Sequence, residues 1–332
     1  MHNHYKYLIL NSFYYIGIAA LACVSIATRA QQPTAAQSYP TKPIRFIVPQ
    51  ATGGSNDTFA RYLSVGLTER LGKQVVVDNR AGADGIIGTE IAARSTPDGH
   101  TWLMASGAYA MNAAVRKMPY DAAKSFDWIA TLGNGTTVLT INLNFPVNSV
   151  KDILALGKAK PGYINLASAG GFQHFISELF RYQSGLNLQI LLYKGGYPAL
   201  LDVVSGQAHM QIGTLVTSHA ILRAGKARAI ATAGRKRTAL MPELPTISES
   251  GLPGYEIANY WAIAASAGTP PAIIDRINKE IAVQLNRAET QKRFAGEGAE
   301  VDIRTPAETS KLISEELIKW ARVAKEAGMK FE

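Results

Sequence analysis

The feature that most constrains the fold is an alternation that begins at Tyr39 and continues to the end of the chain. Apolar runs of strand length, such as IRFIV at 44–48 and HTWLMAS at 100–106, take turns with amphipathic segments of helix length. In the segment 59–71, for example, large apolar side chains recur every four residues, which is a helical spacing. Such alternation is typical of α/β units whose strands are mostly parallel. We therefore predict an α/β fold.

The same patterns place further elements along the chain. The other predicted strands begin at 163 or cover 74–79, 138–144, 188–196, 207–214, 228–234 and 261–268. The other predicted helices lie at 86–95, 149–160, 199–206, 271–288 and 305–328, and one more, within 163–186, follows the Gly-Gly pair and carries Phe175, Ile176, Leu179 and Phe180 on one face. A chain of 332 residues is long enough for two domains, and no low-complexity linker separates them. We therefore expect two lobes joined by crossing strands at 138–144 and 261–268, with residues 39–140 and 262–332 in the first lobe and 141–261 in the second.

The N-terminal segment has the pattern of a secretory signal peptide. A polar start with one lysine is followed by an apolar stretch and then by small and polar residues, and Ala30 is a suitable cleavage position. Residues 1–30 are therefore predicted to be a signal peptide, and the protein is predicted to be exported. The alternatives are a retained membrane anchor and, because ALAC at 20–23 weakly resembles a lipoprotein cleavage box, lipidation at Cys23. Since Cys23 is the chain's single cysteine, cleavage at Ala30 leaves a protein without thiols or disulfides.

The chain is basic, with a formal net charge of +9. Lys6 and Arg29 supply two of these charges, so cleavage after Ala30 leaves 9 − 2 = +7. A positive surface attracts anions. Export and the lack of a Lys/Arg run interleaved with aromatic residues argue against a nucleic-acid partner. Dispersed, solvated charge explains most of this excess.

Two glycine-containing loops stand between a predicted strand and a predicted helix: VPQATGGSND at 48–57 and ASAGGFQH at 167–174. In an open α/β sheet, ligands bind beyond the carboxyl ends of the strands, where helix starts offer free N–H groups to an anion. Neither loop has the lysine of a phosphate loop or the GxGxxG of a dinucleotide site. A carboxylate therefore fits better than a phosphate. The alternative is that the glycines only form tight turns and that Ser55, Asn56 or Asp57 caps a helix.

Catalytic patterns are weak in this sequence. It contains no HExxH metal-ligand spacing and no GxSxG nucleophile turn. His174 is the histidine next to a glycine loop, where it could either donate to a ligand or cap its own helix. We expect no enzyme activity, no metal and no cofactor.

The sequence resembles a known family, the Bug-type extracytoplasmic solute receptors of tripartite tricarboxylate transporters. The resemblance extends from residue 39 to the end, and its landmarks occur in order: GGSNDTFAR (53–61), VVVDNRAGADGIIGTEIAAR (75–94), PDGHTWLM (97–104), YDAAKSFDWIA (120–130), ASAGGFQH (167–174), YKGGYPALLDVVSGQ (193–207), RTALMPELPTISESGLPGYE (237–256) and AGTPPAIIDRIN (267–278).

The resemblance implies a two-lobed periplasmic-binding-protein (Venus flytrap) fold that closes on a small carboxylate, such as a di- or tricarboxylate, an acidic amino acid or an aromatic acid. It implies a monomer that hands its ligand to the membrane permease subunits of a transporter. An orphan sensor that feeds a signalling system, or a secreted enzyme acting on small acids, are the alternatives. The ligand-binding residues that it implies are Gly53, Gly54, Ser55, Asp57, Ser106, Ala108, Ser168, Gly170, Gly171, His174, Tyr193 and Thr214, with Lys194 in the same turn as Tyr193.

Two departures from the family pattern affect these expectations. The first loop reads PQATGG at 49–54 where the family often has PFPAGG. The stretch 210–214, MQIGT, lacks an aspartate that many members carry. Losing that acid removes a partner for an amino group, so we expect amino acids to bind less tightly than the matching diacids. We also expect Ser168→Ala to weaken binding.

Overall fold

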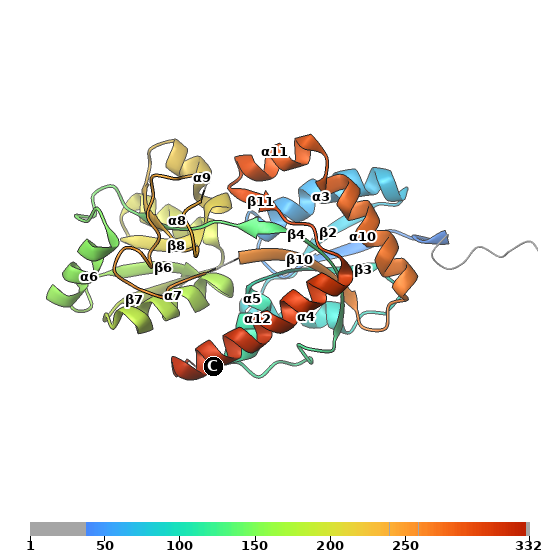
Figure 1. The fold of residues 1–332 in the computed structure, drawn as a ribbon, viewed down its shortest axis with the longest axis horizontal. Helices are drawn as coiled ribbons and strands as arrows, with labels where there is room; N and C mark the ends of the chain where they lie inside the picture. Colours follow the sequence, from blue (N-terminus) through green and yellow to red (C-terminus); the bar gives the residue numbers. More distant parts are fainter. Residues whose placement is uncertain (1–37, 239, 258, 330–332) are drawn as a thin grey trace, which may run out of the picture. The chain divides into compact units, whose positions relative to one another are not determined.

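The computed structural model describes residues 38–329, except 239 and 258. The predicted signal peptide, residues 1–30, and Cys23 lie outside the described residues. From Tyr39 onward the chain forms one unit with two β-sheets that are flanked by helices (Figure 1). Within the described part, no helix has both the length and the apolar character that crossing a membrane requires.

The first sheet has six strands in the order β11-β4-β10-β3-β1-β2. Its strands are β1 (Ile44–Val48), β2 (Val75–Asn79), β3 (Thr101–Ser106), β4 (Phe126–Gly135), β10 (Asn259–Ser266) and β11 (Ala299–Val301). Its helices are α3 (Ser55–Leu71), the short 3-10 helix η1 (Ala83–Gly85), α4 (Ile86–Ala93), α5 (Ala108–Val115), α10 (Pro271–Leu285), α11 (Ala288–Gly296) and α12 (Pro306–Glu326). α3 and α10 cover one face of the sheet, and α4, α5 and α12 cover the other (Figure 1).

The second sheet has five strands in the order β7-β6-β8-β5-β9. Its strands are β5 (Thr137–Ile141), β6 (Asn165–Ala169), β7 (Gln189–Tyr193), β8 (Met210–Thr214) and β9 (Arg228–Thr232). Its helices are α6 (Val150–Ala159), α7 (Phe172–Ser184), α8 (Gly196–Ser205) and α9 (Leu215–Arg223). α7 packs into the large core on one face, and α8 packs on the other face.

The strand directions refine the prediction of mostly parallel sheets. Strands β2-β1-β3 and β7-β6-β8 are parallel blocks, as predicted. The pairings of β10 and β5 with their neighbours are antiparallel, so each sheet is mixed. β5 and β10 are the first strands that the chain forms after crossing from one sheet to the other, and each runs antiparallel to both of its neighbours.

The crossing points also differ from the prediction. Neither 138–144 nor 261–268 spans both sheets, because β5 lies in the second sheet and β10 in the first. The chain instead crosses at Thr136, between β4 and β5, and returns between β9 and β10. The predicted lobe boundaries, after residues 140 and 261, fall inside β5 and β10.

Helix α12 packs against both halves of the molecule, that is, the first sheet with its helices and the second sheet with its helices. It starts with a capping box, in which Thr305 accepts from the Glu308 backbone and Glu308 accepts from the Thr305 backbone. Its body packs on α5 and β4 beside the first sheet. Near its end, Trp320 meets Phe175 of α7 edge-on, with ring centroids 5.0 Å apart. One helix therefore contributes to the cores of both sheets.

Candidate functional site

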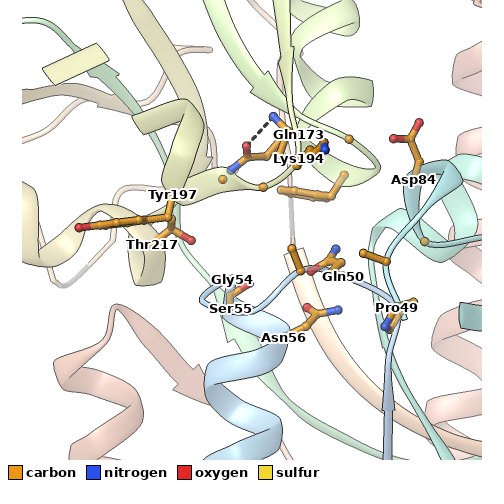
Figure 2. Close-up of a pocket in the computed structure, with 18 of the residues that line it drawn as sticks. Pro49, Gln50, Gly54, Ser55, Asn56, Asp84, Gln173, Lys194, Tyr197 and Thr217 are labelled. Carbon is orange, nitrogen blue, oxygen red and sulfur yellow. Dashed lines mark hydrogen bonds between the residues drawn. The ribbon is translucent and has the colours of Figure 1, made fainter. Parts of the chain in front are cut away.

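A pocket of about 540 Å³ lies where strands of both sheets end. It is lined by the segments that follow β1, β2, β6 and β7, by the last residues of β3 and β8, and by the first residue of β10. Figure 2 shows residues of the first sheet, such as Gln50 and Asn56, facing residues of the second, such as Gln173 and Lys194. This is the position at which open α/β sheets bind ligands.

Three helices that begin beside this pocket have glycine at the N-cap. Gly54 precedes α3, Gly171 precedes α7 and Gly195 precedes α8, and none of the three starts is capped by a side chain. Two helices that begin elsewhere, α6 and α12, are capped by Ser149 and Thr305. Uncapped helix starts expose backbone N–H groups and the positive end of the helix dipole. The pocket is therefore suited to an anion.

The start of α3 is organised by Asp57, which does not line the pocket. Its carboxylate accepts hydrogen bonds from the Gly53 backbone (3.0 Å), Arg61 Nε (3.1 Å) and Asn79 Nδ2 (2.9 Å). Burial alone would raise the pKa of Asp57, but these partners outweigh burial and lower the pKa. Asp57 thus fixes the loop before α3 from behind, and its charge is already compensated.

Asn56 is one of the pocket residues that the sequence analysis did not identify as a ligand contact. It is 1% exposed, lines the pocket, and its Nδ2 has no hydrogen-bond partner among the described residues. An unpaired buried donor is costly, so Asn56 Nδ2 is a candidate partner for a ligand oxygen. Its neighbour Ser55 lines the pocket too, and its Oγ accepts from Trp261 Nε1 at 3.3 Å. In the sequence, the signal that could have identified Asn56 is its position next to Ser55 at the predicted helix start.

Ser168 does not face the pocket. Successive side chains of a strand point to opposite faces, and it is the next residue, Ala169, that lines the pocket. Ser168 is fully buried, where its Oγ donates to the Ala169 carbonyl and accepts from Ser177 Oγ at 3.1 Å. The geometry therefore gives no reason for Ser168→Ala to weaken binding directly.

Ser168 and His174 were predicted to contact the ligand, but in this loop it is the polar side chain of Gln173 that lines the pocket. Its Oε1 accepts from the Ala169 backbone at 3.0 Å, and it lines the pocket. Gln211, in the stretch without the expected acid, donates from Nε2 to the Gly196 carbonyl at 2.9 Å. Gln211 is 2% exposed and outside the pocket lining, so it supports the start of α8.

His174 has neither of the roles that were predicted for it. It lies outside the pocket lining, with Nδ1 3.8 Å from Asp84 and Nε2 3.7 Å from Glu178. Burial alone would lower the pKa of His174, but these two carboxylates outweigh burial and raise the pKa to about 9. His174 is therefore a cation between two acids at the start of α7.

The pocket's other end is formed by α8 and α9, where Tyr197 and Thr217 lie opposite Asp84 in the view of Figure 2. Neither residue was predicted. Tyr193 lines the pocket as expected, but its hydroxyl donates to Asp202 at 2.7 Å, and burial together with this carboxylate raises its pKa to about 12.

The predicted site residues thus divide into two groups. Those that line the pocket are Gly54, Ser55, Ser106, Gly170, Tyr193 and Thr214, with Lys194. Those that do not are Gly53, Asp57, Ala108, Ser168, Gly171 and His174. The second group shapes or supports the loops on which the first group lies. In the described part of the chain, no three His, Cys, Asp or Glu side chains are grouped as metal ligands.

Comparisons with known proteins agree on one family. Residues 59–329 match the model of the tripartite tricarboxylate transporter family receptor. The protein BugT of Bordetella pertussis is 34% identical over 321 residues, which cover 95% of this chain and 98% of BugT.

Two solved structures show the same fold. R. palustris Rpa4515 with adipate has a TM-score of 0.83 and 32% identity, over 88% of this chain and 99% of that one. The periplasmic binding protein BugD has a TM-score of 0.84 and 30% identity, over 89% of this chain and 100% of that one.

Proposed function

The chain belongs to the family of tripartite tricarboxylate transporter receptors, and on this premise we propose that it captures a small organic carboxylate in the pocket between its two sheets. The observation that carries the proposal is the convergence on one pocket of helix starts that no side chain caps. A second support is that Rpa4515, which shares the fold, was solved with adipate, a carboxylate. The family's receptors are periplasmic binding proteins, so the proposed role is binding rather than catalysis.

The residues suggest how a carboxylate would be held. Its oxygens would accept hydrogen bonds from the first-turn N–H groups of α3 and α8 and from Asn56 Nδ2, with Lys194 as the nearby cation. Hydrogen bonds to a charged group contribute about 1.5–3 kcal/mol each. Three or four of them, set against the entropy lost on association, correspond to a dissociation constant of about 1 μM.

We further propose that the receptor is exported by its N-terminal signal and passes its ligand, as a monomer, to the permease subunits of a tripartite transporter. The two lobes would close over the ligand by movement at the crossing points near Thr136 and between β9 and β10. The family's description, a receptor of tripartite tricarboxylate transporters, supports the transport role.

The test is a thermal-shift panel on the mature protein. Aliphatic and aromatic carboxylates are compared with neutral analogues of the same shape, for example benzoate with benzamide. A ligand that binds only the folded state raises the melting temperature. We expect several carboxylates, but not their neutral analogues, to raise it by several degrees. If no carboxylate has an effect, or if neutral analogues do equally well, the proposed function is wrong.

A further inference from the structure

One helix start at this pocket is already occupied by a carboxylate of the protein itself. Asp84, in η1 of the first sheet, lines the pocket beside the start of α7, where a Cβ on Gly170 would overlap its carboxylate and where the backbone of Gly171, the N-cap of α7, helps to lower its pKa. An anion at that position is stabilised by the helix start, as a ligand carboxylate would be. A side chain from one half of the chain therefore fills an anion-binding position of the other half.

Several contacts hold Asp84 in this place. Arg116 Nη2 lies 2.5 Å from its carboxylate, and Asn112 Nδ2 donates to its backbone carbonyl at 2.9 Å. A Cβ added to Gly170 would overlap Asp84 Oδ1, so the glycine leaves room for the carboxylate. Burial alone would raise the pKa of Asp84, but its partners outweigh burial and lower the pKa, which keeps the group ionised.

The backbone of Asp84 has a positive φ. Its φ of 57° and ψ of 27° lie in the left-handed region, which a residue with a side chain adopts at a cost. Aspartate is among the residues that adopt this region most readily, so the turn at η1 accommodates it.

The rest of the pocket has the means to hold one further anion. Among the described residues that line it, Asp84 and Lys194 are the charged ones. The starts of α3 and α8, the unpaired Asn56 Nδ2 and Lys194 provide one cradle for a carboxylate. Much of the remaining lining is apolar, namely Pro49, Ala51, Ala81, Ala83, Phe172 and Pro198. Tyr197, whose side chain is 44% exposed, adds an aromatic face (Figure 2).

We propose that this pocket selects an acid with a single carboxylate and a compact apolar body, because Asp84 takes the place that a second ligand carboxylate would have at α7. A diacid would put its second charge near Asp84, where like charges repel, or against apolar surface, where an unpaired charge is costly. This inference rests on the proposed function and narrows it. It departs from the di- and tricarboxylates that the family resemblance implies.

The test uses matched acids that differ in their second carboxylate. Calorimetry on the mature protein compares hexanoate with adipate, and cyclohexanecarboxylate with cyclohexane-1,4-dicarboxylate. We expect the monoacid of each pair to bind at least tenfold more tightly. If the diacid binds as tightly as its partner or more so, the inference is overturned while the proposed function stands. If none of these acids and no carboxylate of the wider panel binds, the proposed function fails as well.

A variant isolates the role of Asp84. Asp84→Asn removes the charge, and Asp84→Gly removes the side chain while suiting the positive φ, so at least one folded protein is expected. Either variant should shift the ratio of diacid to monoacid affinity at least tenfold toward the diacid. The matched control is Asp302→Asn, since Asp302 pairs with Arg304 outside the pocket and should leave the ratio unchanged. Folded Asp84 variants with an unchanged ratio would refute the assigned role.

Discussion

At the scale of single residues, two neighbours in the first turn of α3 have opposite roles. The carboxylate of Asp57 is surrounded by donors from its own loop, so it organises the backbone and has little capacity left for a ligand. The amide of Asn56 is equally buried, but its Nδ2 has no partner among the described residues. The degree of burial therefore does not distinguish a supporting residue from a ligand-binding residue here. The number of side-chain polar atoms left without a hydrogen-bond partner does.

This difference gives a prediction for Asn56→Ala. Removing the donor should weaken carboxylate binding by about 10–150-fold, because one hydrogen bond to a charged group is lost. Calorimetry with any carboxylate that raises the melting temperature measures the effect. The control is Asn286→Ala, at the exposed end of α10 and outside the pocket lining, which should bind as the wild type does. Equal affinities of the two variants would show that Asn56 does not contact the ligand.

At the scale of elements, the start of α7 combines a backbone N–H group, a histidine and two carboxylates. His174 lies between Asp84 and Glu178, and Arg116 and Arg181 complete the charges that face this cluster. The cluster joins η1 of the first sheet to α7 of the second. The free energy of unfolding of the protein should therefore depend on the protonation of His174.

The sign of the pH effect follows from the raised pKa. The pKa of His174 is about 9 in the folded protein, against a value of 6.5 for an unperturbed histidine. A group with a raised folded pKa stabilises the fold fully below its unfolded pKa and loses that effect as the pH rises through the folded value. The full shift corresponds to about 3 kcal/mol between pH 6.5 and 9.5, and solvent screening of this partly buried group reduces the effect. We therefore predict that the free energy of unfolding falls by about 1–2 kcal/mol more in wild type than in His174→Gln over this range.

Urea denaturation at several pH values measures this difference. His219→Gln, on α9 and outside this cluster, is the matched control and should retain the wild-type pH dependence. If His174→Gln also keeps the wild-type pH profile, the imidazole does not act as a cation between these carboxylates.

The helices and strands with a regular hydrophobic pattern were predicted from the sequence. Strand β4 was not, because some of its residues are determined by contacts with neighbouring strands. β4 was missed because FDWIATLGNG contains two glycines and an asparagine, which disfavour strands. The structure explains the glycines. A Cβ on Gly133 would overlap the Glu300 carbonyl in β11, and one on Gly135 would overlap the indole of Trp261 in β10. Only close packing between β4 and its neighbours requires them, and no local pattern reports such packing.

The site was predicted at the level of loops and less well at the level of side chains. Helix starts and glycines are encoded locally, so Gly54, Ser55 and Gly170 were found. Tyr197, Thr217 and Asp84 reach the pocket only because of how the sheets and helices pack, which one sequence does not reveal. Ser168 was placed wrongly because the phase of β6, which decides the face of each residue, was not predicted.

At the scale of the whole molecule, α12 couples the two halves through Trp320. The indole is 1% exposed, packs edge-on against Phe175 of α7, and donates from Nε1 to Glu316 at 2.6 Å. The same helix packs along α5 and β4 of the first half. This contact ties the two halves together on the side of α12.

The corresponding prediction is that Trp320→Ala lowers the free energy of unfolding by about 3–5 kcal/mol, because a large buried aromatic is removed and a cavity is left. It also deprives the Glu316 carboxylate of its indole donor. Ile318→Ala, on the same helix with 70% exposure, should change the stability by less than about 0.5 kcal/mol. Because Trp320 belongs to a core that both halves share, differential scanning calorimetry should also show a broader, less cooperative transition for Trp320→Ala. A loss as small as that of Ile318→Ala, with an unchanged transition width, would mean that α12 does not couple the two halves.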